Sequence, residues 1–102
     1  MSETAVIRYE MKADRADENQ RLVEKVFAEL AATAPESLRY ACFRLDDGVT
    51  FIHVVTTEGE TNPLMSLPAF AEFQENFGER VDVAPVRGAA TLVGAYNFTL
   101  GS

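Results

Sequence analysis

The sequence Thr-Phe-Ile-His-Val-Val-Thr-Thr at residues 50–57 decides which fold the chain can adopt. Its residues are β-branched or apolar on both sides of an extended backbone, and it carries His53, the single histidine of the chain. Antiparallel strands usually alternate apolar with polar residues, because one face of the sheet meets water. A strand that is apolar on both faces predicts a sheet covered on both sides. The remaining sequence offers helices for one side, so we expect a second copy of the chain on the other.

The length of 102 residues predicts a single domain spanning residues 1–102. Hydrophobic residues make up 47% and charged residues 25%, which is typical of a folded globular chain. Nine Lys and Arg against sixteen Asp and Glu give a formal net charge of −7. This balance argues against a nucleic-acid partner, because phosphate binding requires a concentrated basic surface.

The single cysteine, Cys42, excludes an intrachain disulfide and favours a reducing compartment. Residues 1–10 lack the basic start and long apolar run of a signal peptide. No apolar run approaches the roughly 20 residues that a bilayer-spanning helix needs. We therefore expect a soluble cytoplasmic protein with no membrane contact.

Hydrophobic periodicity predicts three strands and a long helix in the first part of the chain. A strand at 5–11 precedes a helix whose predicted N-cap is Asp17, with Gln20 three residues on at the spacing of a capping box. That helix is expected to end before Pro35. Strands at 38–45 and 50–57 flank Asp46-Asp47-Gly48, whose Asp-Gly pair indicates a tight hairpin turn.

The second part predicts a shorter helix and a last strand. Leu67, Phe70 and Phe77 have helical spacing, and Gly78 is expected to end that helix. Residues 81–88, which include Pro85, are expected to form a connector, and the alternation at 90–100 predicts the fourth strand.

The resulting order predicts an α+β, ferredoxin-like βαββαβ fold, with a four-stranded antiparallel sheet and two helices on one face. The other face would meet a partner subunit. The side chains expected there are Val6, Arg8, Glu10, Tyr40, Cys42, Arg44, Phe51, His53, Val55, Val93, Ala95 and Asn97.

The chain resembles the dimeric α/β-barrel superfamily, which includes the antibiotic-biosynthesis monooxygenase-like proteins and many uncharacterised actinobacterial proteins. The resemblance runs from residue 5 to residue 98. It is carried by Val-Ile-Arg-Tyr-Glu at 6–10, Phe-Arg-Leu-Asp-Asp-Gly at 43–48, and Leu-Pro-Ala-Phe at 67–70 with Phe73 after it.

The resemblance implies a homodimer whose sheets pack face to face, with a small ligand held between each sheet and its own helices. Members of this superfamily include cofactor-independent oxygenases, haem-degrading enzymes and muconolactone-type isomerases, and fold alone does not choose among them. The haem-degrading branch matches poorly, because it relies on an Asn, a Trp and a helix-borne His. This chain contains no Trp, and His53 lies on a predicted strand.

His53 and Arg8 are the candidate catalytic residues. A neutral imidazole accepts and returns a proton near neutral pH, and an arginine on the neighbouring strand would stabilise the resulting anion. The alternative for His53 is a hydrogen-bonded histidine in a sheet interface. Candidate ligand-binding residues are Tyr9, Tyr40, Arg44, Phe70 and Tyr96, for which packing and surface ion pairs are the alternatives.

Two functions follow as hypotheses. The first is a cofactor-independent, monooxygenase-like or isomerase-like enzyme that abstracts a proton from a small aromatic or polyketide-like molecule. The second is a non-catalytic dimer that binds a small ligand or has a structural role, because the chain has few polar groups that could converge on a substrate.

A metal site is not expected, since one histidine with Cys42 and Glu10 has no characteristic spacing. RNA binding through the open sheet is opposed by the acidic charge.

Overall fold

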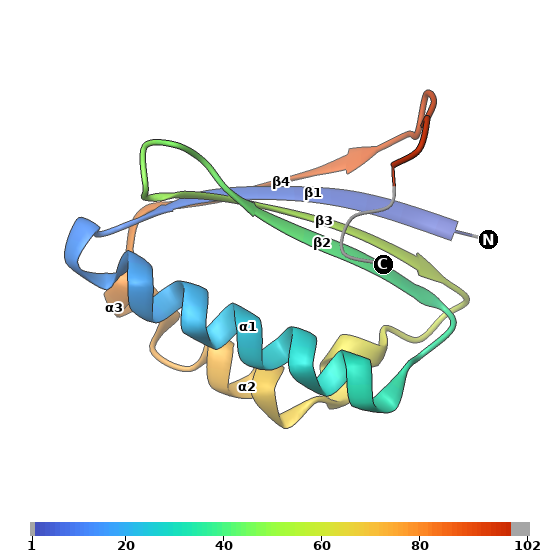
Figure 1. The fold of residues 1–102 in the computed structure, drawn as a ribbon, viewed down its shortest axis with the longest axis horizontal. Coiled ribbons are helices and arrows are strands. Elements are labelled where there is room, and N and C mark those ends of the chain that lie inside the picture. Colours follow the sequence, from blue (N-terminus) through green and yellow to red (C-terminus); the bar gives the residue numbers. More distant parts are fainter. Residues whose placement is uncertain (1, 99–102) are drawn as a thin grey trace.

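One four-stranded antiparallel sheet carries all the helices on a single face (Figure 1). The computed structural model describes residues 2–98. The strands are β1 (Ser2–Met11), β2 (Leu38–Arg44), β3 (Thr50–Glu58) and β4 (Val81–Ala90), in the order β2-β3-β1-β4. The helices are α1 (Ala16–Thr33), α2 (Pro68–Gln74) and α3 (Phe77–Arg80), with short 3-10 turns at η1 (Ala13–Arg15) and η2 (Pro63–Ser66). The predicted ferredoxin-like arrangement is confirmed.

The β2–β3 hairpin forms where the Asp-Gly pair predicts it. Gly48 has a φ of 79°, in the left-handed region that glycine adopts without steric cost, and its N–H donates to the Leu45 carbonyl at 3.0 Å. The Asp47 carboxylate accepts from the backbone N–H groups of Val49 and Thr50, each at 2.9 Å. These bonds set the register in which Cys42 lies opposite His53.

Helix α1 ends as predicted, before Pro35, but it begins differently. Ala34 adopts a left-handed conformation with a φ of 45°, and its N–H donates to the Leu30 carbonyl at 2.7 Å. The prediction of an Asp17 N-cap is wrong, because the N-cap is Arg15 and no side chain caps it. Asp17 lies in the first turn, where its carboxylate pairs with Arg44 at 3.0 Å.

The second helical region is broken in two. Helix α2 ends at Gln74 and α3 begins at Phe77, with Asn76 left-handed at a φ of 59°. Gly78 lies inside α3 and does not end a helix. Arg80 stabilises the break between the two helices, because its guanidinium donates to the backbone carbonyls of Phe73 at 2.6 Å and Glu75 at 2.9 Å.

The fourth strand lies about ten residues earlier than predicted. Strand β4 occupies Val81–Ala90, where a connector was expected, and residues 91–98 form no strand. Pro85 misled the prediction, since proline lacks a donor and is excluded from central strands, but β4 is an edge strand that tolerates it. The β1–β4 register also shifts between Arg8 and Glu10. Residues 99 and 100 of the predicted strand lie outside the described residues.

The face that each residue of the hairpin presents is the opposite of the prediction. Tyr40, Cys42, Arg44, Phe51, His53 and Val55 lie on the helix-bearing side, with Tyr40 stacked on Phe27 of α1 and His53 against Phe73 of α2. Ile52 and Val54 therefore point to the open face, because successive strand residues alternate. In β1 the prediction holds, with Val6, Arg8 and Glu10 on the open face and Tyr9 in the core.

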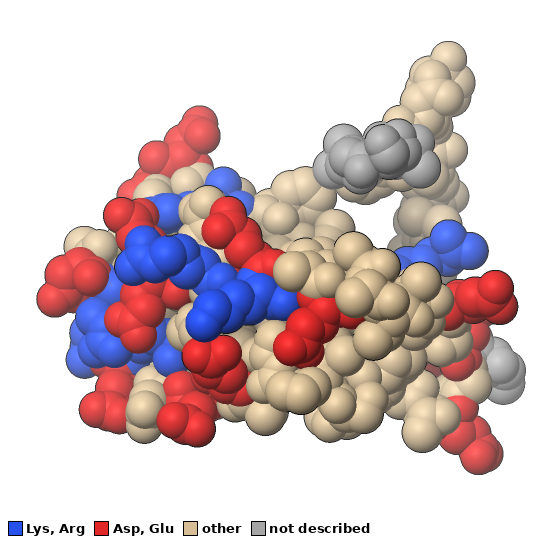
Figure 2. Space-filling model, turned by 60° about the horizontal axis from the view of Figure 1, so that its bottom comes forward, with Lys and Arg blue, Asp and Glu red and all other residues tan. Residues whose placement is uncertain are grey.

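The helix-bearing side presents a mixed charge pattern. Figure 2 shows basic and acidic side chains interspersed over one end of this side, next to an uncharged region. The charged residues coloured there do not form a continuous basic surface of the kind that phosphate binding requires.

Phe51 is a central core residue whose removal we expect to cost about 3–5 kcal/mol of unfolding free energy. It is 1% exposed and stacks on Tyr9 with ring centroids 5.7 Å apart, so Phe51→Ala leaves a cavity that the sheet cannot close. Chemical denaturation of the variant measures this loss. Met65→Ala is the control, since Met65 is 68% exposed and should change the value by less than about 0.5 kcal/mol. Equal effects of the two changes would contradict this account of the core.

Candidate functional site

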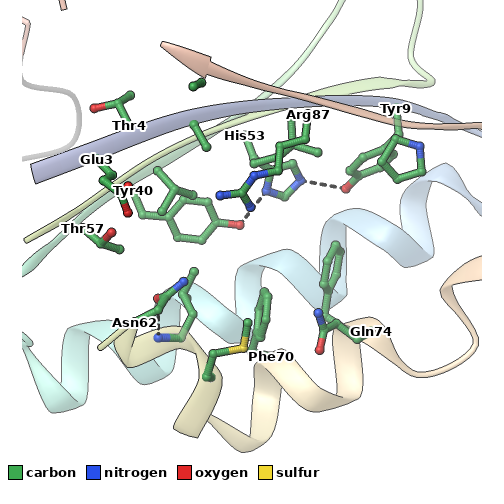
Figure 3. Close-up of a pocket in the computed structure, with 18 of the residues that line it drawn as sticks. Glu3, Thr4, Tyr9, Tyr40, His53, Thr57, Asn62, Phe70, Gln74 and Arg87 are labelled. Atoms are coloured by element: carbon green, nitrogen blue, oxygen red, sulfur yellow. Dashed lines mark hydrogen bonds between the residues drawn. The ribbon is translucent and has the colours of Figure 1, made fainter. Parts of the chain in front are cut away.

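A cavity of about 530 Å³ lies between the sheet and the segment that runs from η2 to α3 (Figure 3). This volume suits a small-molecule site. Apolar and aromatic side chains form most of its wall, and the polar groups include one histidine, two tyrosines and one arginine. The lining residues are Glu3, Thr4, Ala5, Ile7, Tyr9, Tyr40, His53, Val55, Thr57, Asn62, Leu64, Met65, Phe70, Phe73, Gln74, Phe77, Pro85, Arg87 and Ala89.

His53 is held by a tyrosine on each side of its ring. The Tyr9 hydroxyl lies 2.7 Å from Nε2, and the Tyr40 hydroxyl lies 2.5 Å from Nδ1 (Figure 3). The Cys42 sulfur is 3.6 Å from Nε2. These partners come from the strands on both sides of β3, so the β1–β3 and β2–β3 registers together place both hydroxyls at the imidazole.

Asn19 of α1 extends this chain of hydrogen bonds away from the cavity. Its Nδ2 donates to the Tyr9 hydroxyl at 2.9 Å, and its side chain is fully buried. Its Oδ1 has no partner among the described residues. The sequence gives no sign of this contact, because the only pattern that it shows in this helix is the apolar stripe, to which Asn19 does not belong.

Burial keeps the titratable side chains around His53 in their neutral forms near pH 7. It lowers the pKa of His53 to about 4, because the imidazolium would lose its hydration. It raises the pKa of Cys42 to about 12. Burial also raises the pKa values of Tyr9 and Tyr40 above the ordinary tyrosine value. The two tyrosines are therefore hydroxyl groups, and Cys42 is a thiol.

The phenylalanines of α2 and α3 form the aromatic wall facing the sheet. Phe73 lies 6.0 Å from Phe70 and 5.6 Å from Phe77 between ring centroids. The Arg80 guanidinium lies over both Phe73, at 5.8 Å, and Phe77, at 5.6 Å. This buried cation places positive charge behind the aromatic wall, although burial lowers the pKa of Arg80.

Arg87 is the one cationic side chain among the described residues that line the cavity. It is an exposed residue of β4 opposite Ile7, and Figure 3 shows its side chain extending from the edge strand into the region beside the His53 ring. Asn62, Gln74 and Glu3 are further polar residues of the lining. Arg87 was missed because the sequence places it in an expected connector.

The structure brings together four of the candidate residues predicted from the sequence. Tyr9, Tyr40, His53 and Phe70 all line the cavity. Three candidates do not. Arg8 points to the open face. Arg44 binds Asp17 and Gln20 of α1, outside the cavity. Tyr96 is 89% exposed on the segment after β4.

The described residues contain neither a cluster of metal ligands nor a helix suited to crossing a membrane. In residues 2–98, no three His, Cys, Asp or Glu side chains cluster in a way that could hold a metal ion. Within the same range, no helix combines the length and the apolar character that crossing a membrane requires.

The fold is similar to that of several solved structures. One is a "putative antibiotic biosynthesis monooxygenase" from Bacteroides thetaiotaomicron, with a TM-score of 0.77, 13% identity and coverage of 90% of each chain. Another is Rv0793 from Mycobacterium tuberculosis, with a TM-score of 0.70, 11% identity and coverage of 93% of this chain and 98% of that one. A third is SnoaB, a cofactor-independent oxygenase from Streptomyces nogalater, with a TM-score of 0.66, 13% identity and coverage of 94% and 97%.

No family model and no curated protein matches the sequence. Identities of 11% and 13% establish a common fold and leave the activity to be argued from the site. The resemblance to antibiotic-biosynthesis monooxygenase-like proteins is thus confirmed as a likeness of fold.

The lowered pKa of His53 predicts a loss of stability in acid. The unfolded chain takes up a proton near pH 6.5 and the folded chain only near pH 4, so the stabilisation is complete above pH 6.5 and disappears as the pH falls through this range. The contribution is at most about 3 kcal/mol. Denaturation at pH 7 and pH 4.5 should show a larger loss for the native chain than for His53→Gln, whose amide does not titrate. Equal losses would place His53 in a more hydrated environment.

Proposed function

We propose that the chain binds a compact aromatic molecule in the cavity and promotes its reaction with dioxygen without a cofactor, as a monooxygenase-like enzyme. The observation that carries the proposal is the convergence of one cation and a tyrosine–histidine–tyrosine chain on a cavity whose wall is otherwise mostly apolar and aromatic. Such a cavity suits a planar apolar molecule with an oxygen that becomes negatively charged.

His53 acts on the ligand through Tyr40 in this proposal. Both ring nitrogens already have hydroxyl partners, the side chain is 5% exposed, and its lowered pKa makes it a weak base. The direct proton abstraction expected from the sequence therefore has no geometric support. The ligand instead loses its acidic proton to water at the cavity mouth, and the site favours this loss by stabilising the anion. Arg87 takes the role that the sequence suggested for Arg8.

The electron-rich carbon of that anion then adds dioxygen. The peroxide formed takes up a proton and loses water, which leaves a carbonyl group. One oxygen atom enters the product and the other leaves as water, so a methylene compound and dioxygen balance a ketone and water. The protein's contribution is to bind the anion against the aromatic wall, with Arg87 and the Tyr40 hydroxyl available to its charge.

A non-catalytic ligand-binding dimer is the second candidate. The enclosure of His53 favours it, because both ring nitrogens are occupied and cannot take a proton from a ligand directly. The one carboxylate among the described lining residues is Glu3. A site without a suitably placed base is also consistent with binding alone.

We further propose that two copies associate through their open sheet faces. No helix of the described residues covers this face (Figure 1), although apolar side chains occupy much of it. The segment after β4 adds exposed apolar groups, with Leu92 73% and Val93 98% exposed. The apolar residues of the open face include Val6, Ala41, Phe43, Ile52, Val54, Val83 and Val86.

Anthrone is a suitable test substrate, because its methylene protons are acidic and its enolate is electron-rich. The chain should raise dioxygen uptake above the uncatalysed rate, with label from ¹⁸O₂ in the carbonyl product. Arg87→Met should lower kcat/KM about a hundredfold, since it removes the charge that stabilises the anion. Arg21→Met on the surface of α1 is the control and should leave the rate unchanged. Saturable anthrone binding without dioxygen uptake would favour the binding-protein alternative.

The dimer proposal predicts that a charge change on the open face of β3 weakens association, whereas a charge change in the loop after β3 does not. Val54→Asp places an unpaired charge at the centre of the open face in both copies, so the dissociation constant should rise by at least about a hundredfold. Sedimentation velocity measures the change, with Glu60→Lys in the exposed loop as the control. A folded native chain that sediments as a monomer at micromolar concentration would contradict the proposal.

A further inference from the structure

We propose that Asn19 orders the hydrogen bonds around His53 so that Tyr40 offers its hydroxyl proton to the cavity. The cavity then recognises a ligand through an acceptor oxygen, as in a ketone, an enolate or a phenolate. The choice of ligand rests on the function proposed above, whereas the order of the hydrogen bonds does not.

The first step is the contact between Asn19 and Tyr9. An amide nitrogen only donates, so the Tyr9 oxygen accepts from Nδ2 at 2.9 Å. The Tyr9 side chain is 2% exposed, and its own proton needs an acceptor inside the protein. His53 Nε2, at 2.7 Å, provides that acceptor.

The second step passes through the imidazole ring. A neutral imidazole has one N–H donor and one bare nitrogen. Because Nε2 accepts from Tyr9, the proton is on Nδ1, which donates to the Tyr40 oxygen at 2.5 Å. This is the tautomer that a free histidine in water populates less, so the protein has to impose it.

The third step reaches the cavity. The Tyr40 oxygen is occupied as an acceptor, and its hydroxyl proton has no acceptor among the described residues other than the nitrogen that already donates to it. Tyr40 lines the cavity, where Figure 3 shows its hydroxyl end beside the His53 ring. Burial raises the Tyr40 pKa, so the group stays an O–H donor.

The reverse order would require Asn19 to present its oxygen to Tyr9. The amide nitrogen would then be buried with both protons unpaired, whereas the present order leaves Oδ1 as the unpartnered atom. Buried carbonyl oxygens lack partners more often than buried N–H groups do. Asn19 is a positioning residue in this scheme, since Tyr9, His53 and Tyr40 separate it from the ligand.

Nitrogen NMR of the ¹⁵N-histidine-labelled chain tests the order directly, because the chain has a single histidine. At pH 7 the native protein should show a protonated Nδ1 and a bare Nε2. Asn19→Leu should shift the ring toward the Nε2–H tautomer, and Gln20→Leu on the adjacent exposed position should not. An Nε2–H ring in the native protein would overturn the proposal, whatever the variants do.

The ligand part is tested by titrating 1-tetralone and tetralin, two bicyclic molecules that differ in one carbonyl group. Tyr40→Phe should weaken tetralone binding about five- to tenfold and leave tetralin binding unchanged, as expected for one lost hydrogen bond to a neutral acceptor. Equal losses for both molecules would show that Tyr40 only packs against the ligand. If neither molecule binds a native protein that has a protonated Nδ1, the order stands and the proposed function fails.

Discussion

The burial of the His53 ring between the sheet and its helices is the constraint on which the rest of the site depends. A buried imidazole needs a partner at each nitrogen, and here the partners are Tyr9 of β1 and Tyr40 of β2. Asn19 of α1 then holds Tyr9 from behind. A shift of one residue in either strand would turn a tyrosine to the open face and leave the ring unpaired, so the strand registers and the polar chain stabilise each other.

The electrostatics of the cavity contrast with those of the whole chain. The net charge is −7, yet the cavity is lined by Arg87, and Arg80 lies behind the rings of Phe73 and Phe77. No group of the tyrosine–histidine chain is ionised near neutral pH, because burial opposes charge on all of them. In the proposed function, a negative charge brought by the ligand would therefore meet hydrogen-bond donors and a cation rather than a base.

The sequence predicts the element order and part of the site, and it fails where two physical signals conflict. The Asp47-Gly48 turn and the end of α1 at Thr33 were predictable, because each depends on local backbone preferences. The faces of β3 were not, since both faces are apolar and the alternation has no polar side to mark solvent. Strand β4 was missed because Pro85 is disfavoured in strands, an argument that fails at the edge of a sheet. Arg87 was missed with it.

Strand β3 separates two roles by the alternation of its side chains. Its odd-numbered residues Phe51, His53 and Val55 face the helices, where the cavity lies, and its even-numbered residues Ile52 and Val54 face away from them. Phe51 and Val55 pack toward the helices, and Ile52 and Val54 belong to the face proposed to meet a second copy, so the stretch lacks the usual pattern of a half-exposed strand. One rigid strand thus connects the polar chain at His53 to the surface on which a second copy would pack. His53 and Val54 are adjacent in the chain, so the side chain in the polar chain and the side chain on the open face are one peptide unit apart.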